Sequence, residues 1–180
     1  MIPNQKQCYA LWDKYKLPSS KRIHIQVVTN LALFLAKSII KQHPQIKIDL
    51  MLLEAACLLH DIDQQIKPLP GEKHPDTAVR MLKQLEFHSV AQVVAKHALH
   101  CIMDGKTASL AWEEKLLFLA DKMVKYELIG VEHRIKLWLK ENWPETAKNE
   151  LTAAYPKVKQ LEQEILQLAG VSFADIKKEF

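Results

Sequence analysis

The chain has 180 residues, enough for one medium-sized domain with a substantial core. Hydrophobic residues make up 48% and charged residues 26%, the balance of an ordinary soluble globular protein. The net charge of +4 is mildly basic, and without a run of five or six like charges we expect no nucleic-acid partner. The chain has only 4 glycines and is rich in Leu, Ala, Lys, Glu and Gln, so its composition predicts an all-α fold.

The chain divides into helical segments that are separated by prolines, glycines and capping residues. Strand-like alternation, internal repeats and low-complexity tracts are lacking, so the expected architecture is a single bundle of about seven or eight helices. In chain order, the helices are expected over residues 4–16, about 20–42, 50–62, 74–86, 88–103, 111–129, 131–141 and 145–169.

Particular residues set several of these boundaries. Ser19-Ser20 is expected to cap the second helix and Asp49 the third, because their side-chain oxygens accept hydrogen bonds from free backbone amides. Pro75 suits the first turn of the fourth helix. Asp104-Gly105 is expected to end the fifth helix, and Gly130 to close the sixth with a left-handed residue.

The cysteines and the apolar segments bear on the compartment. Cys8, Cys57 and Cys101 are odd in number, far apart and without CxxC spacing, which favours a reducing compartment. The start of the chain, MIPNQKQCYALWDK, lacks the pattern of a signal peptide. The most apolar stretch, residues 23–40, contains several polar side chains and is expected to be a buried core helix, too polar to span a membrane. We therefore expect a cytoplasmic protein with no membrane partner.

The most informative signal is a set of titratable residues in places that should be apolar. Each member either has aliphatic neighbours three and four positions away, which puts it on the inner face of its expected helix, or directly follows an apolar run. The set consists of His24, His60, Asp61, His74, His97 and Asp121.

Burial of these side chains needs a physical explanation. A single inward histidine is usually a core residue that needs only one hydrogen-bond partner. An isolated buried carboxylate, however, costs several kcal/mol unless it is paired or bound to a metal. Asp61 and Asp121 have no obvious local partner except Lys125, expected one turn beyond Asp121. A shared transition metal would remove this cost, and the alternative is a metal-free cluster in which every buried group is hydrogen-bonded.

These residues resemble the signature of a known superfamily. His24, the doublet His60-Asp61 after AACLL, and Asp121 in FLADKMV are similar to the H…HD…D pattern of the HD-domain metal-dependent phosphohydrolases. LEAACLLHDID resembles the AALLHDIG segment of small stand-alone HDIG-type proteins, and EEKLLFLADKMV resembles EEKIVYLADKLV. The resemblance covers roughly residues 8–130. It implies one HD domain over residues 1–180, with the unmatched C-terminal helices of residues 131–180 packed on the same domain.

The resemblance also implies a ligand set. The H…HD…D residues would hold one divalent metal, and Asp61, acting as a bridge, would hold a second with His74 and His97. That second group resembles two-metal relatives that cleave cyclic dinucleotides or diadenosine tetraphosphate. Iron, manganese, nickel, cobalt and zinc all suit imidazole and carboxylate ligands. Asp61 is then the central catalytic residue, because a water activated between two ions would attack phosphorus.

Two departures from the relatives concern the substrate. The glycine of HDIG is Asp63 here, and the lysine that often follows it is Gln64. If that lysine contacts phosphate in the relatives, another residue must fill the role or the role is absent. Lys125 and Lys122 are candidates for this contact, and His100 is a candidate for the mouth of the site. Each lysine also fits an ordinary surface position, and His100 fits a helix cap.

The expected function is hydrolysis of a phosphoester or phosphoanhydride in a small phosphorylated substrate such as a nucleotide. Two alternatives from other classes remain open: a nucleotide-binding regulatory module without turnover, and a di-iron oxygenase on the same fold. A homodimer formed through the C-terminal helices is also open. Trp112, Trp138 and Trp143 are expected in the core or at an interface rather than in a base-stacking platform, since their spacing does not repeat.

Overall fold

The computed structural model describes residues 1–103 and 109–180, and within these ranges the chain is helical with no strand. The prediction of an all-α fold is confirmed. The described residues form nine α-helices rather than seven or eight, because the residues beyond the last expected helix, 145–169, form a helix of their own. The elements are α1 Gln5–Lys14, α2 Ser19–Gln42, α3 Leu50–Leu59, α4 Asp76–Gln84, α5 His88–Val94, the 3-10 helix η1 Leu99–Ile102, α6 Trp112–Met123, α7 Val131–Lys140, α8 Glu145–Ala169 and α9 Phe173–Glu179.

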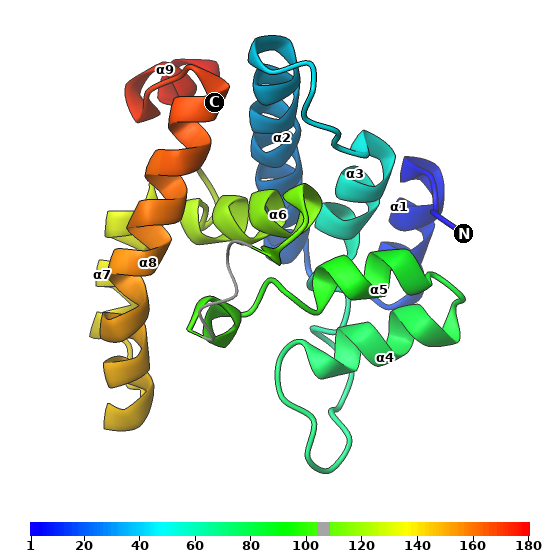
Figure 1. Cartoon of the computed structure of the whole chain (residues 1–180). Coiled ribbons are helices and arrows are strands. Elements are labelled where there is room, and N and C mark those ends of the chain that lie inside the picture. Colours follow the sequence, from blue (N-terminus) through cyan, green and yellow to red (C-terminus); the bar gives the residue numbers. More distant parts are fainter. Residues whose placement is uncertain (104–108) are drawn as a thin grey trace.

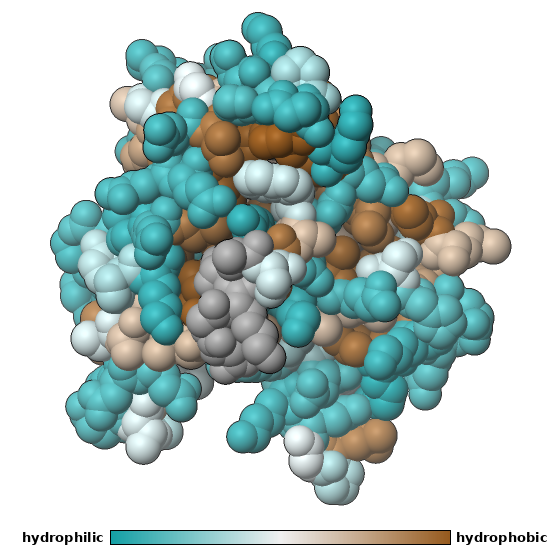
Figure 2. All heavy atoms as spheres, in the orientation of Figure 1, coloured by the Kyte–Doolittle hydropathy of each residue, from teal (hydrophilic) through white to brown (hydrophobic). Residues whose placement is uncertain are grey.

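Helix α2 is the centre of the bundle. It packs against α3, α6 and α8, and Figure 1 shows α6 crossing it while α3 and α8 lie on opposite sides. Its inner face includes Leu31 and Leu35, which are fully buried, and each such side chain contributes about 1.5–3 kcal/mol to folding. Polar side chains cover most of the face seen in Figure 2, as expected when the apolar sides of helices face a core.

Helix α2 is also long and apolar enough to cross a membrane, by length and composition alone. Polarity therefore does not exclude a membrane span, contrary to our expectation from the sequence. Half of its most apolar window is buried inside the bundle, where α3, α6 and α8 contact it. This packing favours the core helix of a soluble protein.

The N-termini of α2 and α3 are capped differently. The predicted cap at Ser19-Ser20 is wrong: α2 begins at Ser19, and Pro18 occupies the N-cap position in an extended conformation without a side-chain hydrogen bond. The predicted cap at Asp49 is confirmed, because its carboxylate accepts hydrogen bonds from the backbone amides of Met51 and Leu52, each at 3.0 Å. This cap fixes the start of the helix that leads into His60.

We expect Asp49→Ala to lower the free energy of unfolding by about 1 kcal/mol, because two amides at the start of α3 lose their acceptor. Urea denaturation of the variant and the wild type measures this difference. Asp49→Ser should recover most of the loss, and Gln45→Ala, an exposed change just before the helix, serves as the control. A loss in Asp49→Ala no larger than in Gln45→Ala would contradict a stabilising cap.

Helices α4 and α5 are shorter than predicted, which moves two candidate ligands off helices. Pro75 precedes α4 at the N-cap position, so His74 lies in the preceding loop. Helix α5 ends at Val94, and His97 lies between α5 and η1. The ring Nδ1 of His97 donates to the carbonyl of Val94 at 2.6 Å, and this acceptor would serve the amide of Ala98 in a continuing helix. The predicted break at Asp104-Gly105 lies outside the described residues.

Helix α6 also ends early, at Met123 instead of residue 129. The backbone amides of Ile129 and Gly130 both donate to the carbonyl of Met123 at 2.9 Å, so the chain turns back over residues 124–130. Gly130 has a φ of 81° and precedes α7 as its N-cap, so it does not close α6 as predicted. Lys125 therefore does not lie one turn beyond Asp121 on the same helix face.

Candidate metal centre

The structure brings all six candidate ligands together at one end of α2. His24 comes from α2, His60-Asp61 follows α3, His74 precedes α4, His97 follows α5, and Asp121 lies on α6. The four imidazole rings form a row with centroid distances of 5.5 Å from His24 to His60, 5.1 Å from His60 to His97, and 4.7 Å from His97 to His74. Residues from five separate segments therefore meet in one cluster.

Within this cluster the ligand atoms form overlapping groups. One group is His24, His60 and Asp121, and a second is His60, Asp61 and His97, with all ligand atoms of a group within 4.8 Å of one another. The Nε2 of His24 lies 3.1 Å from Oδ1 of Asp121, and the Nε2 of His60 lies 3.7 Å from the same oxygen. Ligands at about 2.0–2.2 Å from one metal ion are separated by roughly these distances.

Backbone carbonyls fix the orientation of the three buried rings. The Nδ1 atoms of His24, His60 and His97 donate to the carbonyls of Lys125, Cys57 and Val94, at 2.7, 2.8 and 2.6 Å. A carbonyl oxygen only accepts, so each Nδ1 carries the proton and Nε2 of the neutral ring carries the lone pair. Such a hydrogen bond behind the ring is the usual support of a metal-binding histidine.

The atoms that face one another inside the cluster have unmet bonding needs. The Nε2 of His60 is buried and has no hydrogen-bond partner among the described residues. Leaving a buried acceptor unpaired costs about 1–3 kcal/mol. The Nε2 atoms of His74 and His97 lie only 2.8 Å apart, so at most one proton fits between them. A cation among these nitrogens and carboxylates would satisfy them, and the residues therefore fit a divalent transition metal.

Two lysines pair with the carboxylates, which corrects the expectation that no local cation balances them. Lys21 donates to Oδ2 of Asp61 at 2.6 Å, and Lys122 donates to Oδ2 of Asp121. Lys21 comes from the first turn of α2, 40 positions before Asp61, while the long side chain of Lys122 folds back onto its neighbour. The Oδ1 atoms of both carboxylates remain directed at histidines.

The charges in the cluster set its protonation states. Burial alone would raise the pKa of both aspartates. The charges of a protonated His60 and of Lys21 nevertheless hold the pKa of Asp61 below its usual value, and the charge of Lys122 does the same for the pKa of Asp121. Burial lowers the pKa of His97 to about 3, so that ring is neutral at neutral pH. Ionised carboxylates and a neutral imidazole are the forms that bind a metal.

Asp63 is a seventh candidate that the sequence reasoning missed. Its carboxylate groups with Asp61 and His74 as a set able to hold an ion. Its Oδ1 is buried without a hydrogen-bond partner in the part of the chain that the structure describes, and burial raises the pKa of this carboxyl. Its position, two residues after Asp61, was a usable signal in the sequence. Asp63 was interpreted there only as the replacement of the HDIG glycine.

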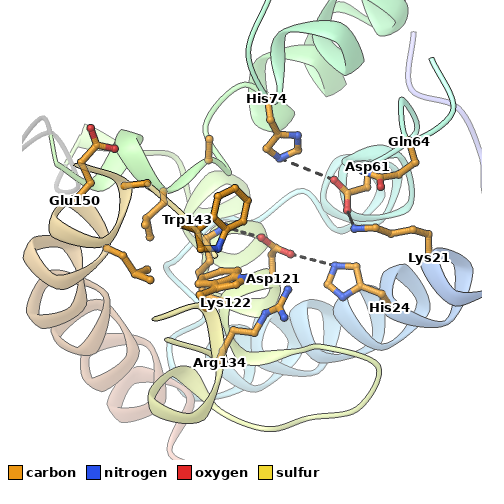
Figure 3. A pocket seen from close by; sticks show the side chains of 15 residues that line it. Lys21, His24, Asp61, Gln64, His74, Asp121, Lys122, Arg134, Trp143 and Glu150 are labelled. Carbon is orange, nitrogen blue, oxygen red and sulfur yellow. Dashed lines mark hydrogen bonds and ion pairs between the residues drawn. The ribbon is translucent and has the colours of Figure 1, made fainter. Parts of the chain in front are cut away.

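The cluster forms the floor of an open pocket of about 470 Å³. Figure 3 shows Lys21 and Gln64 on one side of it, next to Asp61, and Arg134 and Trp143 on the other. A pocket of this volume suits a small molecule. The structure therefore combines a candidate metal site with space for a substrate directly above it.

The residues predicted from sequence for substrate contact are not supported equally. Lys125 and His100 do not line the pocket, and His100 is exposed on η1. Lys122 lines it, but its buried ammonium is already bonded to Asp121 and to the carbonyl of His97. The pocket is lined instead by residues that were not predicted from the sequence to contact substrate. They are Lys21, Arg134, Trp138, Trp143 and Glu150.

Of these missed residues, Lys21 had a readable signal. It lies three positions before His24 on one helix, and residues at this spacing share a face. Arg134 and Trp138 share a face of α7 in the same way, but the direction of that face depends on the turn over residues 124–130. Local spacing could not reveal this turn, because the 111–129 pattern predicted one continuous helix.

Comparison with known families agrees with the geometry. The chain matches the HD domain family over residues 23–126, a stretch that contains all six candidate ligands and leaves out α7, α8 and α9. Searches of the curated proteins and of the solved structures found no match. Because the match covers more than half of the chain and includes the His/Asp cluster, the chain belongs to the HD domain family.

Proposed function

We propose that the chain is a metal-dependent phosphohydrolase that cleaves a phosphoester or phosphoanhydride bond in a small phosphorylated substrate. The observation that carries this proposal is the set of carbonyl-supported histidine nitrogens and ionised carboxylates on the floor of an open pocket. The HD domain family is mostly composed of metal-dependent hydrolases, which supports the same conclusion.

The ligand groups suggest how ions would be held. His24, His60, Asp61 and Asp121 would hold a first ion, and Asp61 would share a second with His74 and His97. A divalent metal at such a site supplies polarisation of a phosphoryl oxygen and a water of lowered pKa. Asp61 belongs both to the group with His60 and His97 and to the group with Asp63 and His74, so this carboxylate is the proposed bridge between the two positions.

Other residues hold this arrangement in place. Lys122 joins the two ligand groups, because its ammonium donates both to Asp121 and to the backbone carbonyl of His97 at 2.7 Å. Lys21 restrains Asp61 in a similar way, because its ammonium donates to Oδ2 of that carboxylate. We assign both lysines a positioning role. Direct phosphate contact by Lys122 is disfavoured, because its side chain is buried and fully engaged.

Metal removal provides a test that is independent of turnover. An ion present at 100 times its dissociation constant adds about 2.7 kcal/mol of stability. For a chain of this length, we expect EDTA to lower the Tm by about 5–10 °C and readdition of metal to restore it. Thermal unfolding with and without chelator measures the shift. The same Tm in both conditions, with metal analysis showing that the ion was removed, would contradict a metal centre that stabilises the fold.

A substrate screen tests the activity itself. Protein loaded with manganese, iron, nickel or cobalt is incubated with phosphomonoesters, nucleotides and dinucleotides, and phosphate or nucleotide release is measured. We expect release that EDTA abolishes and metal restores. A loaded centre without hydrolysis of any compound would contradict the proposal and favour a binding module. A red-brown iron protein that consumes oxygen would favour the oxygenase alternative.

A further inference from the structure

The pocket above the metal centre has one wall that comes from outside the family match. Arg134 and Trp138 lie one turn apart on α7, and Trp143 lies between α7 and α8, all of them beyond residue 126. In Figure 3 the guanidinium of Arg134 points from α7 toward Asp121 and His24. This wall therefore brings a cation and aromatic rings to the proposed site of chemistry.

Arg134 differs from the other cations of the pocket in its bonding. Lys21 and Lys122 are each paired with an aspartate, whereas the side chain of Arg134 forms no ion pair and no hydrogen bond with any other described residue. Its Nε is buried without an acceptor, which leaves a donor that a bound ligand can satisfy. The guanidinium lies 4.5 Å from the ring centroid of Trp138, and this stacking restricts its orientation.

We propose that Arg134 binds the phosphate group of the substrate, and that Trp143 packs against a flat ring in the remainder of the molecule. The proposal rests on the proposed function, since it supposes that a phosphate reaches the metal centre. The planar guanidinium donates two parallel hydrogen bonds to a phosphate, a geometry that lysine lacks. Gln64, on the other side of the pocket, is uncharged and supplies no competing cation.

The aromatic part of the wall indicates the class of substrate. Trp143 is 49% exposed, although tryptophan normally buries its large apolar surface, and it stands at the pocket rather than in the core. Flat rings stack on such a side chain with little dependence on their substituents. The volume of about 470 Å³ suits one small molecule. The inferred substrate is therefore a small organic phosphate with a flat ring, of which a nucleoside monophosphate is the simplest kind.

Non-hydrolysable phosphonates test this assignment without any need for turnover. Methylphosphonate carries only the anionic group, and benzylphosphonate adds a flat ring. Calorimetry measures their affinities for the manganese-loaded wild type, Arg134→Met, Arg134→Lys and Trp143→Ala. We expect Arg134→Met to weaken the binding of both ligands about tenfold or more. Arg134→Lys should weaken it less, because lysine keeps the positive charge but cannot donate two parallel hydrogen bonds. Trp143→Ala should weaken benzylphosphonate alone, by about tenfold.

Two exposed positions outside this pocket provide matched controls. His133→Ala changes the neighbour of Arg134 on the same helix, and Tyr126→Ala removes an exposed aromatic ring. Both should bind the two phosphonates like the wild type, and all variants should keep the metal content of the wild type. Wild-type affinity for methylphosphonate in Arg134→Met would overturn the phosphate role. Equal weakening of both ligands in Trp143→Ala would overturn the ring role.

Failure of this inference and failure of the proposed function would give different results. Binding that depends on Arg134, in a protein that hydrolyses nothing in the substrate screen, would support this inference and contradict the hydrolase. Hydrolysis with an unchanged KM in Arg134→Met would support the hydrolase and overturn the inference.

Discussion

Asp61→Ala is expected to abolish phosphate hydrolysis and most metal binding, with a loss of turnover of at least about 10³-fold. Asp61 belongs to two of the three ligand groups and lies between His60, His74 and His97. Its removal should therefore disassemble both ion positions, whereas loss of a residue at the edge of the cluster should affect only one. Metal analysis of the purified variant, together with the hydrolysis rate, measures both effects.

The controls for Asp61→Ala must separate chemistry from folding. Asp61→Asn keeps the shape of the side chain and should lose activity and metal to a similar extent. His43→Ala, at the end of α2, and His133→Ala, on α7, change histidines outside the cluster and should alter neither quantity. Substantial hydrolysis by Asp61→Ala would place the chemistry elsewhere in the molecule.

His97→Ala is expected to reduce the metal content from two ions to one and to lower turnover by about 10–100-fold or more. The Nε2 of His97 lies 2.8 Å from that of His74, and His97 shares a ligand group with Asp61 and His60. Calorimetric titration of metal-free wild type and variant gives the number of ions directly. His100→Ala, three positions further along the chain and exposed, is the matched control.

The alternative role for His97 gives a different result. Its ring is buried and donates to the carbonyl of Val94, so it also stabilises the turn that follows α5. If that is its only role, the variant should lose thermal stability while one ion binds to both proteins. A single ion in wild type and variant alike would contradict the two-metal assignment and favour a mononuclear centre.

The sequence predicted which His and Asp side chains come together better than it predicted the residues around them. His24 and Asp121 lie on regular helices, where spacing of three and four residues identifies the inner face. His74 and His97 were selected by the same argument but lie in loops, so their place in the cluster does not follow from a helix face. In their case the resemblance to two-metal relatives is the part of the prediction that does not depend on a helix face.

The partners of the ligands depend on tertiary structure. The carbonyl that orients His24 belongs to Lys125, more than 100 positions away, in a turn that the sequence reasoning read as helix. The pocket wall that contains Arg134 depends on the same turn, because it determines how α7 leaves α6. The helical period of apolar residues in a sequence predicts which face of a helix is buried, but it does not predict which element covers that face. The sequence pattern therefore could not predict the pocket wall that contains Arg134.

The assembly of the centre from distant segments also constrains the order of events during folding. His24 and Asp121 are 97 positions apart, so the chain must close a long loop before these ligands meet. The unfolded chain offers an ion only isolated fragments such as His60-Asp61, and no preformed group of ligands exists before the helices pack. An ion is therefore a poor template for early folding. We therefore expect the helical bundle to reach its packed state before it takes up an ion.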